Sequence, residues 1–395
     1  MTAPQTEFET TGEWTSHAAE ATFLKQIAAE TAAVLIEAGK TVEGRPIHRV
    51  DLGNPQGSTV LIVCAQHGTE PASREAGLKL VRDLAYSSDP GVARYLTNHR
   101  LVMVPNVNAD RIPTTRLNAA GVNLNRDWFK LTQPESQAVQ EVILDAQPAV
   151  VLDAHETLNT AADWHPYPAG LPGTHPNITG LATEWVSRAT SMLADDGYTT
   201  RYYLVGFLPW AGLSTVANAA HAVGILSETV ATHDAERRIQ IQQAMFMDLL
   251  TWHGENVTAI DAARAKSMLA AIASTDPVPV PTREYIGTGA VTTVDVAGYE
   301  LGEPIPQHLI DAHGITVDGS YVTVNQPARL IVAALCDPDS VEKVVSATRV
   351  AKPPGRSALP DGVPASALVM VGGRPRPVIG MYYQQGGRRI PVSLT

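Results

Sequence analysis

The stretch from Ser58 to Ala85, STVLIVCAQHGTEPASREAGLKLVRDLA, decides the fold class of this chain. It begins with an apolar run rich in β-branched residues, STVLIVCA, and continues through a short polar loop into PASREAGLKLVRDLA, where apolar residues recur at helical spacing. A buried strand followed at once by a helix is the repeating unit of a parallel sheet, because the crossover helix covers one face of that sheet. The stretch therefore predicts an α/β fold.

The same alternation continues along the chain. RLVMVPN (100–106), PAVVLDA (148–154) and HAVGILSE (221–228) are typical of buried strands, and helical segments lie between them and in a long run from about 234 to 273. We expect one α/β domain over residues 1–275, with a mostly parallel sheet covered by helices on both faces. Apolar periodicity from 17 to 40 predicts a further helix that ends at Gly39.

The composition changes after residue 275. The segment DPVPVPT (276–282) is expected to be a stiff connector. Residues 283–350 include AVTTVDVAGYEL, ITVDGSYVTVNQP and ARLIVAALC, whose β-branched residues predict a small β-rich domain. In residues 351–395, GGRPRPV recurs as GGRRIPV, which predicts a linker followed by a terminal β-hairpin. The alternative for this end is a docking element for a homo-oligomer or a larger assembly.

Composition excludes several classes of partner. The chain has 395 residues, of which 40 are acidic and 29 basic, and the formal net charge of -11 argues against a nucleic-acid partner. No apolar run approaches the roughly 18 residues that span a bilayer, and the N-terminus has no basic and apolar leader pattern, so we expect neither membrane insertion nor a signal peptide. A cytoplasmic or virion-associated location fits. Cys64 and Cys336 predict no disulfide framework.

Three His-x-x-Glu pairs occur, and their positions differ. His67 and Glu70 directly follow the strand STVLIVCA, where an open parallel sheet collects its functional groups. An imidazole and a carboxylate at this spacing suit one divalent ion. The pairs His17/Glu20 and His233/Glu236 lie near predicted helix starts, so a solvated or capping pair is the favoured interpretation for both.

Two further strand ends supply polar groups. His155 ends the run AVVLDAHE, and two histidines with one carboxylate form the ligand set of a catalytic zinc site. Asp153 or Glu156 is expected to fix the tautomer of the imidazole. Glu228 ends another apolar run and is a candidate general base. In the polar loop 106–128, Arg116 and Arg126 are suited to polarise a carbonyl and to clamp a carboxylate.

Taken together, these motifs resemble the zinc metallocarboxypeptidase family. The resemblance covers roughly residues 15–255 and rests on GKTVEGRPIHRVDLG, HGTE, NADRIPTTRLNAAGVNLNRDW, DAHE and SETV. It implies an eight-stranded mixed sheet in an α/β/α sandwich and one zinc ion per chain. By motif it implies the following roles: His67, Glu70 and His155 as zinc ligands, Glu228 as the base, Arg116 as the group that polarises the oxyanion, and Asn125 and Arg126 as the grip on a terminal carboxylate.

Other features bear on the substrate. The short Arg116-to-Arg126 loop is closest to the bacterial branch that cuts cell-wall peptides at the γ-D-glutamyl to diaminopimelate bond, which makes a peptidoglycan stem peptide an expected partner. The specificity pocket is expected in residues 210–219, where Leu213 and Thr215 offer no charge. Tyr202 and Tyr203 are both candidates for the family's mobile tyrosine.

The sequence departs from the family pattern at two places, and two other functions compete with the peptidase interpretation. Asn108 to Arg111 read Asn-Ala-Asp-Arg where the family usually has Asn-Pro-Asp-Gly, and Asn123 replaces a common aspartate. One rival is a zinc deacylase of small N-acyl amino acids. The other is a structural or binding protein that keeps a metallopeptidase fold; its terminal repeat resembles the hairpins of minor tail proteins in phages of actinobacteria.

Overall fold

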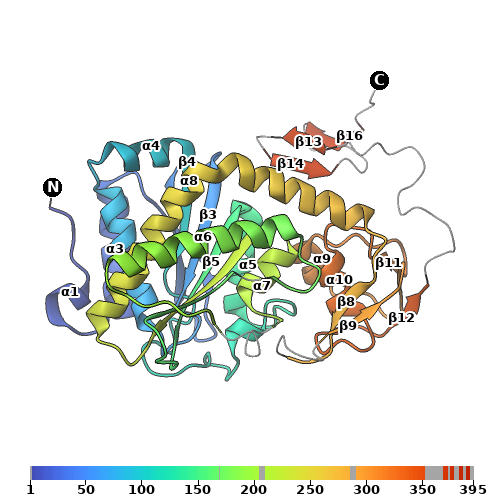
Figure 1. Cartoon of the computed structure of the whole chain (residues 1–395), viewed down its shortest axis with the longest axis horizontal. Coiled ribbons are helices and arrows are strands. Elements are labelled where there is room, and N and C mark those ends of the chain that lie inside the picture. Colours follow the sequence, from blue (N-terminus) through green and yellow to red (C-terminus); the bar gives the residue numbers. More distant parts are fainter. Residues whose placement is uncertain are drawn as a thin grey trace.

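The computed structural model of the chain describes residues 2–168, 170–203, 210–284 and 291–351, together with the backbone of four strands at 368–371, 374–377, 382–385 and 388–391. Figure 1 shows an α/β body with the residues that follow helix α8 joined to one of its ends. The long helix α8 runs across the body and leads directly into that region.

A seven-stranded mixed sheet lies at the centre of the first 275 residues. Its order is β1-β2-β4-β3-β5-β7-β6; β4, β3, β5 and β7 run parallel, whereas β1, β2 and β6 are antiparallel to their neighbours. The strands are β1 (Val34–Lys40), β2 (Pro46–Gly53), β3 (Ser58–Cys64), β4 (His99–Val104), β5 (Val150–Thr157), β6 (Trp164–Tyr167) and β7 (Val223–Val230). The predicted mixed, mostly parallel sheet is confirmed.

The expected eighth strand is present only as a short ladder. Residues 199–203 run parallel to β6, where Arg201 donates its backbone N–H to Trp164 and Tyr203 donates to Pro166, both at 2.9 Å. Residues 204–209, which follow, lie outside the described residues. The sheet thus has seven regular strands among the described residues, and this ladder extends it beyond β6.

Helices cover both faces of the sheet, because alternate strand side chains point to opposite sides. Leu61 and Val63 of β3 belong to one apolar cluster, whereas Val60 and Ile62 belong to the other. Helices α2, α3, α6 and α8 pack on the second face, and α5 and α7 pack on the first. The helices are α1 (Glu7–Thr11), α2 (His17–Glu30), α3 (Pro71–Ala85), α4 (Pro90–Asn98), α5 (Pro134–Ala146), α6 (Pro176–Asp195), α7 (Leu213–Ala219) and α8 (Ala235–Ala273), with a 3₁₀ turn η1 (Leu124–Arg126).

The helix expected over 17–40 is shorter than predicted. It ends at Glu30, and Val34–Lys40 form the edge strand β1, which pairs with β2. The prediction was wrong because apolar residues at 32 and 35 fit a helical spacing as well as they fit a half-exposed strand. This edge strand places β2 inside the sheet, where its side chains are buried.

The region after α8, predicted to be β-rich, contains two helices, α9 and α10, as well as the five strands β8 to β12 in its described residues. The expected connector at 276–282 contains the buried strand β8 (Val278–Pro281), and the segment ARLIVAALC contains helix α10 (Arg329–Cys336). A short, uniformly apolar run fits a buried helix and a strand equally well, which explains the second error. The remaining elements are β9 (Val291–Val294), β10 (Gly298–Leu301), α9 (Gln307–His313), β11 (Tyr321–Thr323) and β12 (Ala347–Val350).

This region shares a core with the α/β body. One continuous apolar cluster includes Val151 of β5, Val216 of α7 and Ile331 of α10. A cavity of about 300 Å³ lies at the junction and is lined by side chains such as Leu213, Met268 and Ile331. The two parts of the chain are therefore packed together rather than linked only by a tether.

The last described residues form two hairpins where one was predicted. Strand β13 (Leu368–Val371) pairs with β14 (Arg374–Pro377), and β15 (Tyr382–Gln385) pairs with β16 (Arg388–Pro391). The two Gly-Gly pairs stand in the sequence between the paired strands, at positions outside the described residues. The repeated GGR motif thus corresponds to one hairpin per repeat.

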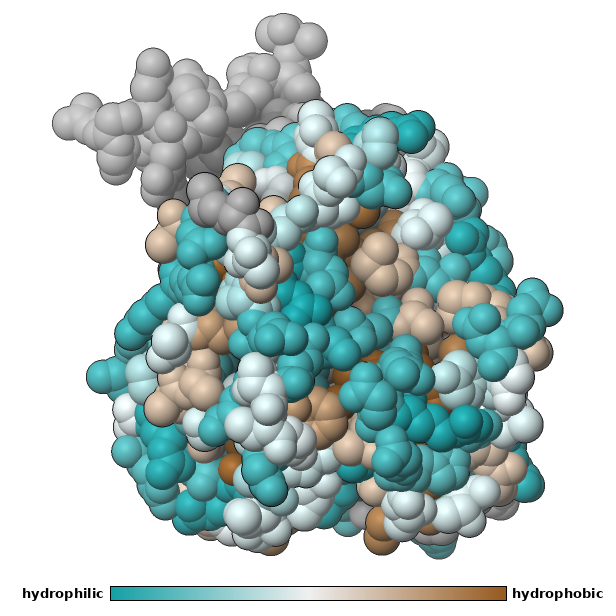
Figure 2. All heavy atoms as spheres, turned by 90° about the vertical axis from the view of Figure 1, so that its left-hand side faces the viewer, coloured by the Kyte–Doolittle hydropathy of each residue, from teal (hydrophilic) through white to brown (hydrophobic). Residues whose placement is uncertain are grey.

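Figure 2 shows the face on the left-hand side of Figure 1, where hydrophilic side chains predominate and apolar ones form small separate patches. Among the described residues, no helix combines the length and apolar character needed to cross a membrane. Cys64 and Cys336 are both buried and unpaired, so no disulfide joins them.

Candidate active site

Three side chains with metal-binding donors meet at the carboxyl ends of two neighbouring strands. His67 and Glu70 lie in the turn between β3 and α3, and His155 lies near the end of β5. One donor atom from each lies within 4.8 Å of the others, and all three residues are buried. Glu70 is the N-cap of α3, and Pro71 at the first helical position fixes where the helix begins. The strand-end prediction for these three residues thus agrees with their observed position.

Both imidazoles turn the same ring atom toward Glu70. Nδ1 of His67 lies 2.8 Å from Oε1 of Glu70, and Nδ1 of His155 lies 2.7 Å from Oε2. The opposite nitrogens face acceptors: His67 Nε2 lies 2.9 Å from Oδ1 of Asn123, and His155 Nε2 lies 2.7 Å from Oδ1 of Asp153. Nε2–H donation to these oxygens leaves both Nδ1 lone pairs on the side of the rings that faces Glu70, which is the tautomer that a metal ion held there requires.

The donor set therefore fits zinc. Two neutral imidazoles and one carboxylate are the ligands of a catalytic zinc site, and hydrogen-bonded partners on the far nitrogens are its usual support. Of the two residues proposed to orient His155, Asp153 does so. Glu156 instead accepts from the backbone N–H of Ala72 and pairs with Arg238, so that alternative was wrong.

The electrostatics favours a charged carboxylate at the centre of the cluster. Burial alone would raise the pKa of Glu70, but the two histidines outweigh it and lower that pKa well below its usual range. Burial lowers the pKa of His67. For His155, burial is outweighed by Asp153 and Glu70, which raise its pKa. An anion between two imidazoles is the charge arrangement that a divalent cation stabilises.

Glu228 lies beside the candidate metal ligands. It is the register partner of His155 on the adjacent parallel strand β7, so the two side chains project from neighbouring positions on one face of the sheet. Burial raises the pKa of Glu228 to about 8, although the nearby His155 acts to lower it. Within the described part of the chain, no hydrogen bond or ion pair holds this carboxylate, which leaves it available for proton transfer.

Two of the predicted substrate groups also reach the cluster. Nη1 of Arg116 lies 2.8 Å from Oε1 of Glu70, and half of the Arg116 side chain is exposed. Asn125 is buried; its Nδ2 donates to Oδ2 of Asp153 at 3.2 Å and lies beside Nε2 of His155, while its Oδ1 accepts from the backbone N–H of Leu213. The loop from 106 to 128 thus brings both groups to the ligands.

Arg126 has a partner that the sequence did not suggest. Its Nε lies 2.9 Å from Oε1 of Glu284, a residue of the region after α8. The backbone N–H of Trp210 donates to the carbonyl of the same glutamate. The added region therefore supplies an acidic group to the residue expected to grip a substrate carboxylate.

The tyrosine and pocket predictions have different outcomes. Tyr203 is half-buried, and burial together with the charge of Glu228 raises its pKa, which places it near the site. Tyr202 is 46% exposed. Leu213 and Thr215 are both buried in the packing of α7, where the Thr215 hydroxyl donates to backbone carbonyls. Their role in a specificity pocket stays a prediction.

One supporting residue was missed. Gln66 is fully buried, its Nε2 donates to Asp153, and its Oε1 accepts from the indole of Trp128. The only feature of the sequence that could have indicated this role of Gln66 is its position directly before His67. The role of Asn123 against His67 was also not foreseen, although the replacement of an aspartate there was noted.

The other His-x-x-Glu pairs also differ from each other. Glu20 is completely buried and hydrogen-bonded to His48, so the solvated or capping interpretation of His17 and Glu20 was wrong. His233 lies 3.3 Å from Asp163, and the exposed Glu236 is near Lys79 instead, so this pair gathers no ligand set.

The fold and part of the sequence are similar to those of zinc carboxypeptidases. The sequence profile described as zinc carboxypeptidase matches residues 21–149. The structure is similar to a metallo-carboxypeptidase from Burkholderia cenocepacia, with 23% identity, a TM-score of 0.53, and coverage of 60% of this chain and 69% of that one. It is also similar to a metallo-carboxypeptidase from Pseudomonas aeruginosa solved in complex with (2-guanidinoethylmercapto)succinic acid, with 19% identity, a TM-score of 0.50, and coverage of 62% and 69%.

These similarities confirm the resemblance to the zinc metallocarboxypeptidase family, in sequence over residues 21–149 and in fold over 60% of the chain. No protein of curated function matches the chain in sequence.

Proposed function

We propose that this protein is a zinc-dependent hydrolase that cleaves a C-terminal or γ-D-glutamyl peptide or amide bond. The observation that carries the proposal is the convergence of His67 Nδ1, His155 Nδ1 and the Glu70 carboxylate beside the unbound carboxylate of Glu228. Zinc at such a site supplies Lewis acidity, which activates water and polarises the carbonyl that is attacked.

The side chains of the protein would carry the remaining steps. Glu228 would accept the proton of the attacking water and return it to the leaving amine, a role suited to a buried carboxylate whose pKa is raised to about 8. Arg116 would stabilise the negative charge that develops on the carbonyl oxygen, because its exposed guanidinium reaches the ligand cluster. Asn125 would hold the substrate against the same cluster.

The residues around the candidate metal cluster support a substrate class. The short Arg116-to-Arg126 loop supports a cell-wall stem peptide, and Arg126 supports a substrate with a free carboxylate. The zinc deacylase of N-acyl amino acids would use the same ligands, so the two candidate activities differ only in the size of the acyl part accepted.

A substrate panel tests this proposal. The purified zinc-loaded chain would be incubated with four compounds at equal concentration: a γ-D-glutamyl-diaminopimelate peptide, an ordinary peptide with a free C-terminus, the same peptide amidated, and an N-acetyl amino acid. We expect release from the first compound to be fastest and the amidated peptide to be poor. Release from the N-acetyl amino acid alone would favour the deacylase activity. No release from any compound would overturn the proposal that the protein is a hydrolase.

We also propose that residues 351–395 mediate association between copies of the chain, as the duplicated GGR sequence suggests. Light scattering on the full chain and on a chain ending at residue 350 would test this. The expected result is an oligomer that is lost on truncation, and a full-length monomer would contradict it.

A further inference from the structure

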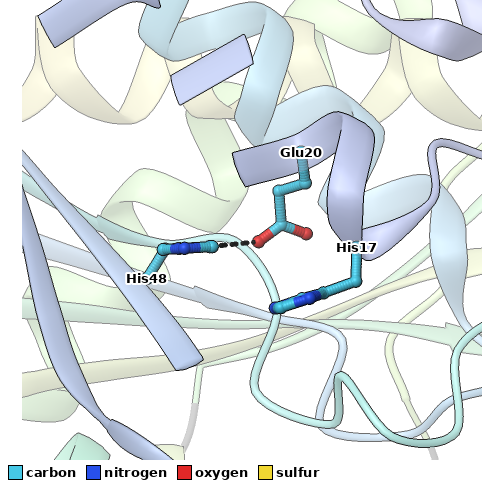
Figure 3. A group of neighbouring side chains, drawn as sticks. All are labelled: His17, Glu20 and His48. Carbon is cyan, nitrogen blue, oxygen red and sulfur yellow. Dashed lines mark hydrogen bonds and ion pairs between the residues drawn. The ribbon is translucent and has the colours of Figure 1, made fainter. Parts of the chain in front are cut away.

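A second cluster of metal-binding donors lies away from the candidate active site. His17 and Glu20 project from the first turn of α2, and His48 projects toward them from β2 (Figure 3). One donor atom from each residue lies within 4.8 Å of the others. Glu20 and His48 are buried, and the imidazole rings of His17 and His48 lie nearly parallel, with centroids 5.4 Å apart.

The buried carboxylate of Glu20 needs a positive charge nearby. Its side chain is 0% exposed, and its partners among the described residues are Nδ1 of His48 at 2.9 Å and Nδ2 of Asn106 at 2.8 Å. Neither partner is a lysine or an arginine. An isolated carboxylate in such a place is costly, and a bound cation would balance its charge.

The surrounding hydrogen bonds orient the donors as they would around a metal ion. Nε2 of His17 lies 2.9 Å from the carbonyl oxygen of Pro46, which can only accept, so Nε2 carries the proton and Nδ1 keeps its lone pair. The amide of Asn106, which is fully buried, fixes the second oxygen of Glu20. Such outer partners are typical of metal-ligating histidines and carboxylates.

The distances are compatible with a tetrahedral ion. Donor atoms about 2.0–2.2 Å from zinc stand roughly 3.3 Å apart. The present donors lie within 4.8 Å, so side-chain movements on the order of 1 Å would complete the geometry. His17 is only partly buried, so its side chain has room to make that movement.

We infer that His17, Glu20 and His48 form a second divalent-metal site, suited to zinc, that fastens the start of α2 to strand β2. Two imidazoles and one carboxylate favour a borderline ion such as zinc over calcium or magnesium. The role is structural, because the ligands tie an N-terminal helix to the sheet and the candidate base Glu228 belongs to the other cluster.

Metal counting on the full-length chain tests this inference. The protein would be stripped with a chelator, reloaded with zinc, dialysed, and analysed for zinc per chain. We expect about two zinc ions in the unmodified protein and about one in His17→Ala, in Glu20→Gln and in His67→Ala. His233→Ala is the matched control, because His233 also belongs to a His-x-x-Glu pair but has no third ligand; it should keep two.

A second readout covers the case in which Glu20→Gln fails to fold. His17→Ala removes a partly exposed ligand and leaves the buried contacts of Glu20 in place, and circular dichroism would verify its fold. Zinc should raise the melting temperature of His67→Ala but not that of His67→Ala combined with His17→Ala. A single zinc in the unmodified protein, lost with His67→Ala and unaffected by His17→Ala, would overturn the inference while leaving the candidate active site intact.

Discussion

Nε2 of His155 lies 2.7 Å from Oδ1 of Asp153, two residues earlier on the same strand. Strand geometry places both side chains on one face, so β5 carries a metal ligand together with the group that orients it. Asp153 is itself held by amide donors from Gln66 and Asn125. The imidazole of His155 is thus fixed before any ion binds.

The first prediction concerns Asp153→Asn. An asparagine does not fix the His155 tautomer as an aspartate does, so zinc affinity should fall roughly 10–100-fold. Competition with a chromophoric chelator would measure the change. Glu156→Gln is the control, because Glu156 contacts Arg238 and Ala72 instead of the ligands, and burial raises its pKa to about 7. Equal affinity in Asp153→Asn and the unmodified chain would refute this role.

Glu284 should compete with the substrate for Arg126. An exposed ion pair contributes at most about 1 kcal/mol, so Glu284→Gln should lower KM up to roughly fivefold for a peptide with a free carboxylate, with kcat unchanged. The amidated peptide should show no change. Glu303→Gln, an exposed change elsewhere in the same region, is the control. A raised KM in Glu284→Gln would mean that the glutamate assists binding rather than competing with the substrate.

Acid should weaken the fold through buried neutral histidines. His221 bonds to the carbonyl of Pro327, and His313 bonds to the carbonyl of Phe129, so each joins the α/β body to the added region. Burial lowers the pKa of both to about 4. Below pH 6.5 the unfolded chain binds protons that the folded chain does not, so stability is present at neutral pH and is lost as pH falls toward 4.

Urea unfolding at pH 7 and pH 5 would measure this loss. Each histidine should contribute a decrease of about 2 kcal/mol in the free energy of unfolding between these two values. His313→Asn should therefore show a smaller decrease than the unmodified chain, by about that amount. An unchanged decrease would show that His313 does not contribute.

Gly68 should matter because another backbone lies against it. A Cβ at this position would lie 2.4 Å from the carbonyl oxygen of Thr115 and 2.5 Å from that of Arg111. Gly68→Ala would displace the loop that carries Arg116, and we expect kcat/KM to fall by about tenfold or more. Gly180→Ala is the matched control: that glycine lies inside α6 with open space around it, so the change should stabilise the fold by up to about 1 kcal/mol. Activity retained in Gly68→Ala would exclude this packing argument.

The sequence could predict the candidate metal cluster because its signal is local. His67, Glu70, His155 and Glu228 each stand at or just after an apolar strand, and parallel strands bring such ends together. The contacts of Gln66 and Glu284 could not be predicted in the same way, because they depend on side-chain directions and on the packing of distant segments.

The errors have similar causes. Glu20 was interpreted as solvated because its partner His48 lies 28 residues away, on a strand whose burial depends on β1. Helix α10 was expected to be β because the seven apolar residues that follow Arg329 show no period that separates a helix from a strand. In both cases tertiary contacts outweighed the local pattern.

The most direct test compares zinc content and peptide release in the unmodified protein and in Glu228→Gln. The account predicts equal zinc in both, since Glu228 is not a ligand, and a loss of release of roughly 10²–10⁴-fold in the variant. Release that persists in Glu228→Gln, or that continues after zinc is removed from the unmodified chain, would contradict the proposed mechanism.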